Sequence, residues 1–98
     1  MKIADAVIAI MCLESTDKNW GIVPFDRHDL CCEILKKSGK ETKTGDRRYL
    51  LNSGRYHDCK RVADALERDP RFEKFLVNHG IRRRLFRYRG EMEDFCIL

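Results

Sequence analysis

Apolar side chains recur at helical spacing in the first third of the chain. Residues 2–14 place apolar side chains around most of a helix, and the alanine, methionine and leucine residues among them favour that state. A buried strand is the alternative, because residues 6–10 form an unbroken apolar run. A second helix is predicted over residues 26–37, where Asp26 takes the N-cap position and Gly39 follows the last turn.

The same spacing predicts two consecutive helices in the second half of the chain. Residues 55–67 carry one continuous apolar face with basic residues largely on the other side. Asp69 and Pro70 then restart the chain as N-cap and first helical residue, since a proline needs no amide partner there. This fourth helix is predicted over residues 70–79, with Gly80 closing it.

Polar and turn-forming residues separate these helices. Residues 20–25 contain a proline and are too short for a helix, so they predict a short extended piece that packs Trp20 inward. Residues 38–46 contain no large apolar side chain and predict an exposed loop. Residues 47–52 fit a short strand or a helical turn equally well, and residues 52–54 (Asn-Ser-Gly) predict a break in the chain.

The pattern becomes mixed from residue 81 onward, where the charge of the chain is densest. Five arginines occur within residues 81–89, interleaved with two aromatic side chains. A C-terminal β-hairpin with Gly90 at its turn is the preferred interpretation. A helix over the same residues is the alternative.

Together these elements predict a mostly helical α+β fold with about four helices and a C-terminal β-hairpin. The chain has 98 residues, enough for one modest core, so residues 1–98 are expected to form a single globular domain. The element order resembles a winged-helix arrangement, in which a core of three helices presents one helix and a hairpin wing to nucleic acid. The resemblance lies in element order alone, and the helix predicted at residues 70–79 departs from it.

The composition indicates where the chain is expected to reside. No apolar run reaches the roughly 18 residues that a membrane span needs. The apolar stretch at residues 3–13 is not followed by a credible signal-peptide cleavage site. We therefore expect an intracellular, cytoplasmic protein with no membrane partner, whose cysteines are reduced rather than paired in disulfides. The five cysteines are Cys12, Cys31, Cys32, Cys59 and Cys96.

Positive charge is concentrated in one part of the chain. Eleven Lys/Arg stand against five Asp/Glu between Arg55 and Gly90, whereas residues 1–54 hold nine against eight and residues 91–98 hold three acids. Arginine offers planar donors to phosphate oxygens, and aromatic rings stack on bases. We therefore predict a small non-catalytic protein that contacts the phosphate backbone of DNA or RNA. The candidate contacts are Arg82, Arg83, Arg84, Arg87, Arg89 and Tyr88, then Lys60 and Arg61 on the preceding helix, with Arg47 and Arg48 as a second patch.

Two other interpretations of the Arg-rich segment remain open. The same Arg and aromatic side chains suit a small inhibitor or adaptor that binds an acidic protein. They also suit a solvated strand whose arginines pair with Glu91, Glu93 and Asp94 across a hairpin. The apolar residues 95–98 suit pairing with a second copy of the chain, so a homodimer is a further hypothesis.

No residue pattern in the chain predicts a catalytic or metal site. His28 and Cys31 are spaced as HxxC, and His57 and Cys59 as HxC, but structural zinc sites usually draw on CxxC pairs, which this chain lacks. His28, Asn52 and His57 follow the residue order of an HNH nuclease, yet that motif needs its first histidine on a strand. Cys59 and His57 point to different sides of a helix, so they do not form a nucleophile and base. We expect no cofactor and no enzymatic activity.

Overall fold

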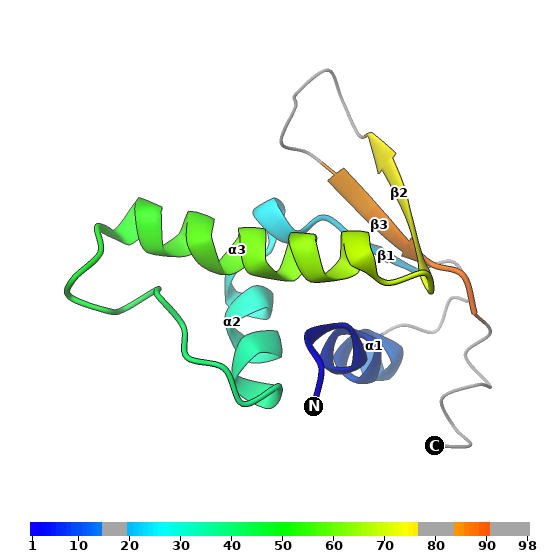
Figure 1. Ribbon diagram of the computed structural model, residues 1–98, viewed down its shortest axis with the longest axis horizontal. Helices are drawn as coiled ribbons and strands as arrows, with labels where there is room; N and C mark the ends of the chain where they lie inside the picture. Colours follow the sequence, from blue (N-terminus) through cyan, green and yellow to red (C-terminus); the bar gives the residue numbers. More distant parts are fainter. Residues whose placement is uncertain (15–19, 77–83, 91–98) are drawn as a thin grey trace.

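In a computed structural model of the chain, the described residues form three α-helices and a three-stranded antiparallel sheet, with the longest helix packed beside the sheet (Figure 1). The structure describes residues 1–14, 20–76 and 84–90. In chain order the elements are α1 (Ile3–Glu14), β1 (Gly21–Ile22), the 3₁₀ turn η1 (Pro24–Asp26), α2 (His28–Lys37), α3 (Leu51–Arg68), β2 (Phe72–Leu76) and β3 (Arg84–Tyr88). The predicted α+β class is therefore confirmed.

The described chain has three α-helices rather than about four, because the segment predicted as the fourth helix contains strand β2. Its entry is a tight turn: the amide of Phe72 donates to the Asp69 carbonyl at 3.1 Å, and the amide of Arg71 donates to Asp69 Oδ1 at 2.9 Å. Proline suits the second position of such a turn as well as the first position of a helix, so Pro70 did not distinguish the two. Residues 77–79 lie outside the described residues.

Helix α3 begins at Leu51, four residues before the predicted start, and the predicted break at residues 52–54 is wrong. The reason is a close backbone contact at Gly54. A Cβ built on Gly54 would lie 2.6 Å from the carbonyl oxygen of Lys43, so the loop before α3 crosses the helix where it has no side chain. The glycine is a packing position within the helix and does not end it.

Helix α2 begins two residues later than predicted, because Asp26 belongs to η1 and Arg27 takes the N-cap position without a side-chain cap. Its end agrees with the prediction. Gly39 has φ +77°, its amide donates to the Lys36 carbonyl, and the amide of Lys40 donates to the Leu35 carbonyl at 2.8 Å. This pair of bonds is a Schellman motif, which requires the left-handed conformation that glycine adopts without strain.

The sheet order is β1-β3-β2, so β3 is the central strand. Phe86 lies opposite Ile22 of β1, and Tyr88 lies opposite Phe72 of β2. The strand interpretation of the Arg-rich segment is thus confirmed over Arg84–Tyr88, and the helical alternative is wrong there. The hairpin partner is β2, which precedes β3; residues 91–98 lie outside the described residues.

The inner face of the sheet and the helices share one core of buried side chains. Trp20 stacks on Tyr88 with ring centroids 5.4 Å apart and an interplanar angle of 7°, and it meets Phe72 edge-on at 6.0 Å. The predicted inward packing of Trp20 is therefore confirmed, as is the helix at the start of the chain. None of the helices among the described residues is long and apolar enough to cross a membrane.

Candidate nucleic-acid interface

The Arg-rich segment is divided by the alternation of strand β3. Arg84, Phe86 and Tyr88 point toward the helices, and the residues between them point away from the helices. The Arg84 side chain is only 18% exposed, and its guanidinium donates to Glu67 on α3 and lies 3.9 Å from Asp64. The rings of Phe25 and Phe86 lie about 6 Å from the same guanidinium. Arg84 thus links β3 to α3 through these ion pairs.

Arg87 and Arg89 lie on the outer side of the sheet and are exposed. The Arg87 guanidinium lies 5.3 Å from the centre of the Phe75 ring, and Arg89 Nε is 3.7 Å from Glu73 Oε1. These two arginines present their charge to solvent. Arg82 and Arg83, and the predicted partners Glu91, Glu93 and Asp94, lie outside the described residues.

Tyr88 does not fit the stacking role predicted for it. Its side chain is 7% exposed and its ring lies against Trp20 and Phe72, so it is a core residue. The sequence could have indicated this position, because Tyr88 falls in phase with Phe86 on an alternating strand.

Lys60 and Arg61 follow each other on α3 and point in different directions. Lys60 Nζ lies 2.6 Å from Asp64 Oδ2 on the solvent side of the helix. Arg61 Nη1 donates to the carbonyl oxygen of Glu41 at 2.6 Å, so it holds the loop before α3. Lys60 is exposed at the candidate surface, whereas Arg61 has a structural contact.

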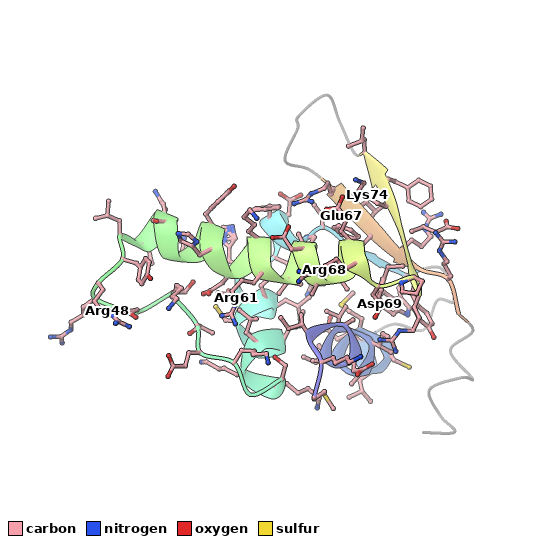
Figure 2. All side chains as sticks on the ribbon, in the orientation of Figure 1. Arg48, Arg61, Glu67, Arg68, Asp69 and Lys74 are labelled. Atoms are coloured by element: carbon pink, nitrogen blue, oxygen red, sulfur yellow. The ribbon has the colours of Figure 1, made fainter. Side chains whose placement is uncertain are left out.

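Arg47 and Arg48 lie at the opposite end of α3 from the sheet. Figure 2 shows Arg48 at that end, with Glu67 and Lys74 together at the other. Helix α3 has 18 residues, so Arg47 and Arg48 lie about 25 Å from the basic residues of the sheet. Arg48 donates to both carboxylate oxygens of Asp46, and these bonds lower the pKa of Asp46 to about 2. The structure therefore does not gather the predicted residues into one patch.

From the solvent-facing side of α3, the sequence prediction had named Lys60 alone as part of the site. At helical spacing, the residues opposite the core form one stripe, named here the α3 stripe. Its amino-terminal part has no carboxylate, and its carboxyl-terminal part has two, both held in ion pairs with basic residues. The α3 stripe consists of Ser53, Tyr56, His57, Lys60, Asp64 and Glu67.

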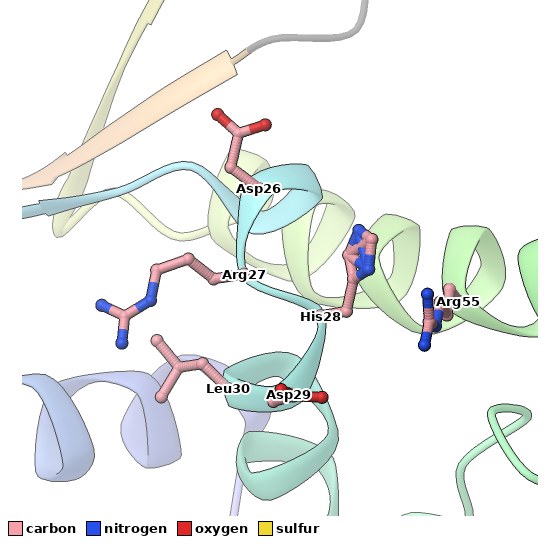
Figure 3. Close-up of a pocket in the computed structure, with 6 residues that line it drawn as sticks. All are labelled: Asp26, Arg27, His28, Asp29, Leu30 and Arg55. Carbon is pink, nitrogen blue, oxygen red and sulfur yellow. The ribbon is translucent and has the colours of Figure 1, made fainter.

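A surface pocket of about 370 Å³ lies where α2 begins, and Figure 3 shows its lining. It combines acidic and basic side chains, and His28 Nε2 lies 3.0 Å from the carbonyl oxygen of Phe25. Within residues 1–14, 20–76 and 84–90, no three His, Cys, Asp or Glu side chains are grouped closely enough to hold a metal ion. The residues lining the pocket are Asp26, Arg27, His28, Asp29, Leu30 and Arg55.

Two cysteines face each other across the contact between α2 and α3. Cys31 on α2 and Cys59 on α3 are buried free thiols. The neighbouring Cys59 thiol and burial raise the pKa of the Cys31 thiol, which donates to the Pro24 carbonyl oxygen at 3.3 Å. Both thiols act as core residues in this arrangement.

Comparisons of the chain with protein-family models, with curated proteins and with solved structures found no match in any of the three.

Proposed function

We propose that the chain is a non-catalytic nucleic-acid-binding domain that contacts its partner through α3 and through the β2–β3 hairpin beside it. The observation that carries this proposal is a shared ion pair between the two elements. Glu67 on α3 accepts from Lys74 of β2 at 2.6 Å and from Arg84 of β3. These bonds hold the hairpin beside the solvent-facing side of α3.

The proposal includes a winged-helix-like arrangement. It is supported by the element order α1-β1-α2-α3-β2-β3 and by the sheet order β1-β3-β2. It is also supported by strand β2, which occupies the segment whose predicted helix departed from that arrangement. In this proposal α3 is the helix, and the β2–β3 hairpin the wing, that approach the nucleic acid.

The basic residues have different roles in this proposal. Arg47, Lys60, Arg87 and Arg89 present exposed charge and contact phosphates, and Arg48 assists beside Asp46. Arg61 and Arg84 keep the surface in shape through their contacts with the loop and with Glu67. Arg82 and Arg83 belong to the segment between the two hairpin strands and stay candidates for phosphate contact on the sequence alone.

The test is fluorescence anisotropy with labelled nucleic acids, titrated across salt concentration. Each phosphate contact contributes about −0.9 to the slope of log affinity against log salt on duplex DNA. Replacing Arg47, Lys60, Arg87 and Arg89 by alanine should therefore flatten the slope by about 3 to 4 and weaken binding strongly. Arg84 and Arg61 are left unchanged, so the variant keeps the contacts that hold the loop and the hairpin in place.

Lys36→Ala with Lys37→Ala is the matched control, because both lysines are exposed at the end of α2, away from α3 and the hairpin. The control should shift the affinity only slightly. A slope change in the control about half that of the four-residue variant would show that only net charge matters. An absence of wild-type binding at low salt would exclude the function.

A second candidate function is binding of an acidic protein, and the exposed apolar end of β2 favours it. Phe75 and Leu76 are 41% and 73% exposed, and Arg87 lies over the Phe75 ring. Exposed aromatic and Arg side chains are common at the centres of protein interfaces. Under this alternative, Phe75→Ser with Leu76→Ser abolishes capture of a carboxylate-rich partner, and the wild-type protein does not bind nucleic acid.

A further inference from the structure

A second, smaller pocket adjoins the one at the start of α2. Its volume is about 200 Å³, and it shares His28 and Arg55 with the larger pocket. Most of its other lining is apolar: the Phe25 and Tyr56 rings lie 5.7 Å apart, and the buried Cys59 also contributes. We name the larger one the charged pocket and the smaller one the aromatic pocket. The residues lining the aromatic pocket are Phe25, His28, Asn52, Arg55, Tyr56 and Cys59.

Arg55 is a basic residue of both pockets that lacks a partner. Its side chain is half-buried on α3, and its guanidinium forms no ion pair or hydrogen bond with the part of the chain that the structure describes. A half-buried cation has lost some of its hydration, which costs free energy unless another group compensates for it. An anionic group of a ligand would supply that compensation at Arg55.

The other arginine of the charged pocket already has a partner. Arg27 Nη2 lies 3.4 Å from Glu14 Oε2. Figure 3 shows the Arg27 side chain on one side of the connection between η1 and α2, and Arg55 on the other side together with His28. Of the two arginines that line this pocket, Arg55 is therefore the one that can bind a ligand.

The charged pocket also holds an acid without a partner. Asp29 is exposed in the first turn of α2, and its carboxylate forms no ion pair with residues 1–14, 20–76 or 84–90. A simple anion bound to Arg55 would be repelled by this carboxylate in the same pocket. A ligand that carries a positive charge beside its negative charge complements both residues.

We propose that these two pockets bind an α-amino acid with an apolar side chain. At neutral pH such a molecule carries a carboxylate and an ammonium group on the same carbon atom. The carboxylate accepts from the Arg55 guanidinium, whose planar donors match its two oxygens. The ammonium group donates to the carboxylate of Asp29, and the side chain packs against the Phe25 and Tyr56 rings of the aromatic pocket. The site does not require nucleic-acid binding and is tested separately from the proposed function.

The experiment is an NMR titration of the ¹⁵N-labelled wild-type protein with L-phenylalanine and with L-leucine. Three analogues of phenylalanine are titrated in parallel: 3-phenylpropanoate lacks the amino group, 2-phenylethylamine lacks the carboxylate, and glycine lacks the side chain. Phenylalanine or leucine should give saturable shifts of the backbone amides around His28 and Arg55. Each analogue should bind about fivefold to tenfold more weakly than phenylalanine, because each lacks one charged contact or the apolar contact.

Replacing Arg55 by glutamine tests the carboxylate contact. Arg55→Gln should weaken phenylalanine binding about tenfold and leave the affinity for 2-phenylethylamine unchanged, because this amine has no carboxylate. Arg27→Gln is the matched control, since it removes the same charge from the same pocket at an arginine that is paired with Glu14. The control should bind phenylalanine as the wild type does.

Replacing Asp29 by asparagine tests the ammonium contact. Asp29→Asn should weaken phenylalanine binding by up to about fivefold without weakening 3-phenylpropanoate, which has no amino group. Asp26→Asn is the control, because Figure 3 shows the Asp26 side chain directed away from Arg55. This control should keep the wild-type affinity for both molecules.

Three results would overturn the amino-acid site. The first is an absence of saturable shifts with phenylalanine and leucine up to about 10 mM, beyond the range of a weak specific ligand. The second is an equal loss of phenylalanine binding in Arg55→Gln and Arg27→Gln. The third is binding of the analogues as tight as that of phenylalanine, because the site then does not recognise the three groups of an amino acid together.

Discussion

The carboxylate of Asp58 accepts the backbone amide of Thr44, fourteen residues earlier in the chain, at 2.8 Å. The other oxygen of the same carboxylate accepts the amide of Lys43, also at 2.8 Å. Asp58 is 1% exposed, so this acid within α3 serves as the anchor of the loop before it. A segment without apolar side chains is thereby held in place through its backbone.

Replacing Asp58 by alanine should lower the free energy of unfolding by about 3 kcal/mol, because two amides lose a charged acceptor. Urea unfolding measures this difference. Asp64→Ala is the control, since Asp64 forms a surface pair with Lys60 that is worth less than about 1 kcal/mol. Similar losses in the two variants would contradict the anchoring role of Asp58.

Replacing Gly54 by alanine should destabilise the protein, although alanine is the better helix former by about 1 kcal/mol. The added Cβ would meet the Lys43 carbonyl at 2.6 Å, and that backbone is fixed by Asp58. The expected loss is about 1 to 3 kcal/mol by thermal or urea unfolding. Ser53→Ala, one residue earlier and exposed, should be neutral or slightly stabilising. A more stable Gly54→Ala variant would show that the loop does not cross the helix there.

Stability should fall in acid through Asp69. Its hydrogen bonds with Arg71 hold the pKa of this carboxyl below its usual value. The stabilisation is fully present above about pH 4, the ordinary range of an aspartate, and is lost as the pH falls through the lower pKa of the folded state. Urea midpoints measured from pH 7 down to acid should therefore decline less steeply in Asp69→Asn, which already lacks this contribution at neutral pH.

The thiols should react in an order set by burial. Cys12 is half-buried, whereas Cys31 is fully buried with a raised thiol pKa. In a Cys96→Ser background, an aromatic disulfide reagent should label Cys12 well before Cys31, and peptide mass mapping reads the order. Labelling of Cys31 should need urea, because a protonated, inaccessible thiol is a poor nucleophile. Rapid labelling of Cys31 in the native protein would contradict its position in the core.

The residues around β2 show what the sequence could and could not specify. Phe72, Phe75 and Leu76 fit a helical face, yet only Phe72 is buried, and the other two are exposed. The segment is a strand because β3 supplies backbone partners to it, from Phe72 opposite Tyr88 to Leu76 opposite Arg84. The spacing of apolar residues within a segment does not depend on such a distant partner. It therefore predicted α1 and α2 well and failed at β2.

The candidate site also depends on contacts between residues that are distant in the sequence. Composition located the basic part of the chain, but the direction of each side chain depended on the strand phase of Arg84 and Arg87 and on the acids that α3 presents. Asp58 illustrates the limit most clearly. A lone acid on a predicted helix is normally solvated, and only the loop that folds over it makes it a buried acceptor.

The central position of β3 also has a consequence for the order of folding. Strand β1 has β3 as its neighbour in the sheet, and their paired residues, Ile22 and Phe86, lie 64 positions apart along the chain. Contacts between such distant residues close a long loop and form slowly. During synthesis the helices emerge before β3, so Trp20 stays uncovered until Tyr88 has emerged and packs against it. The chain therefore completes its sheet only after its Arg-rich segment has left the ribosome.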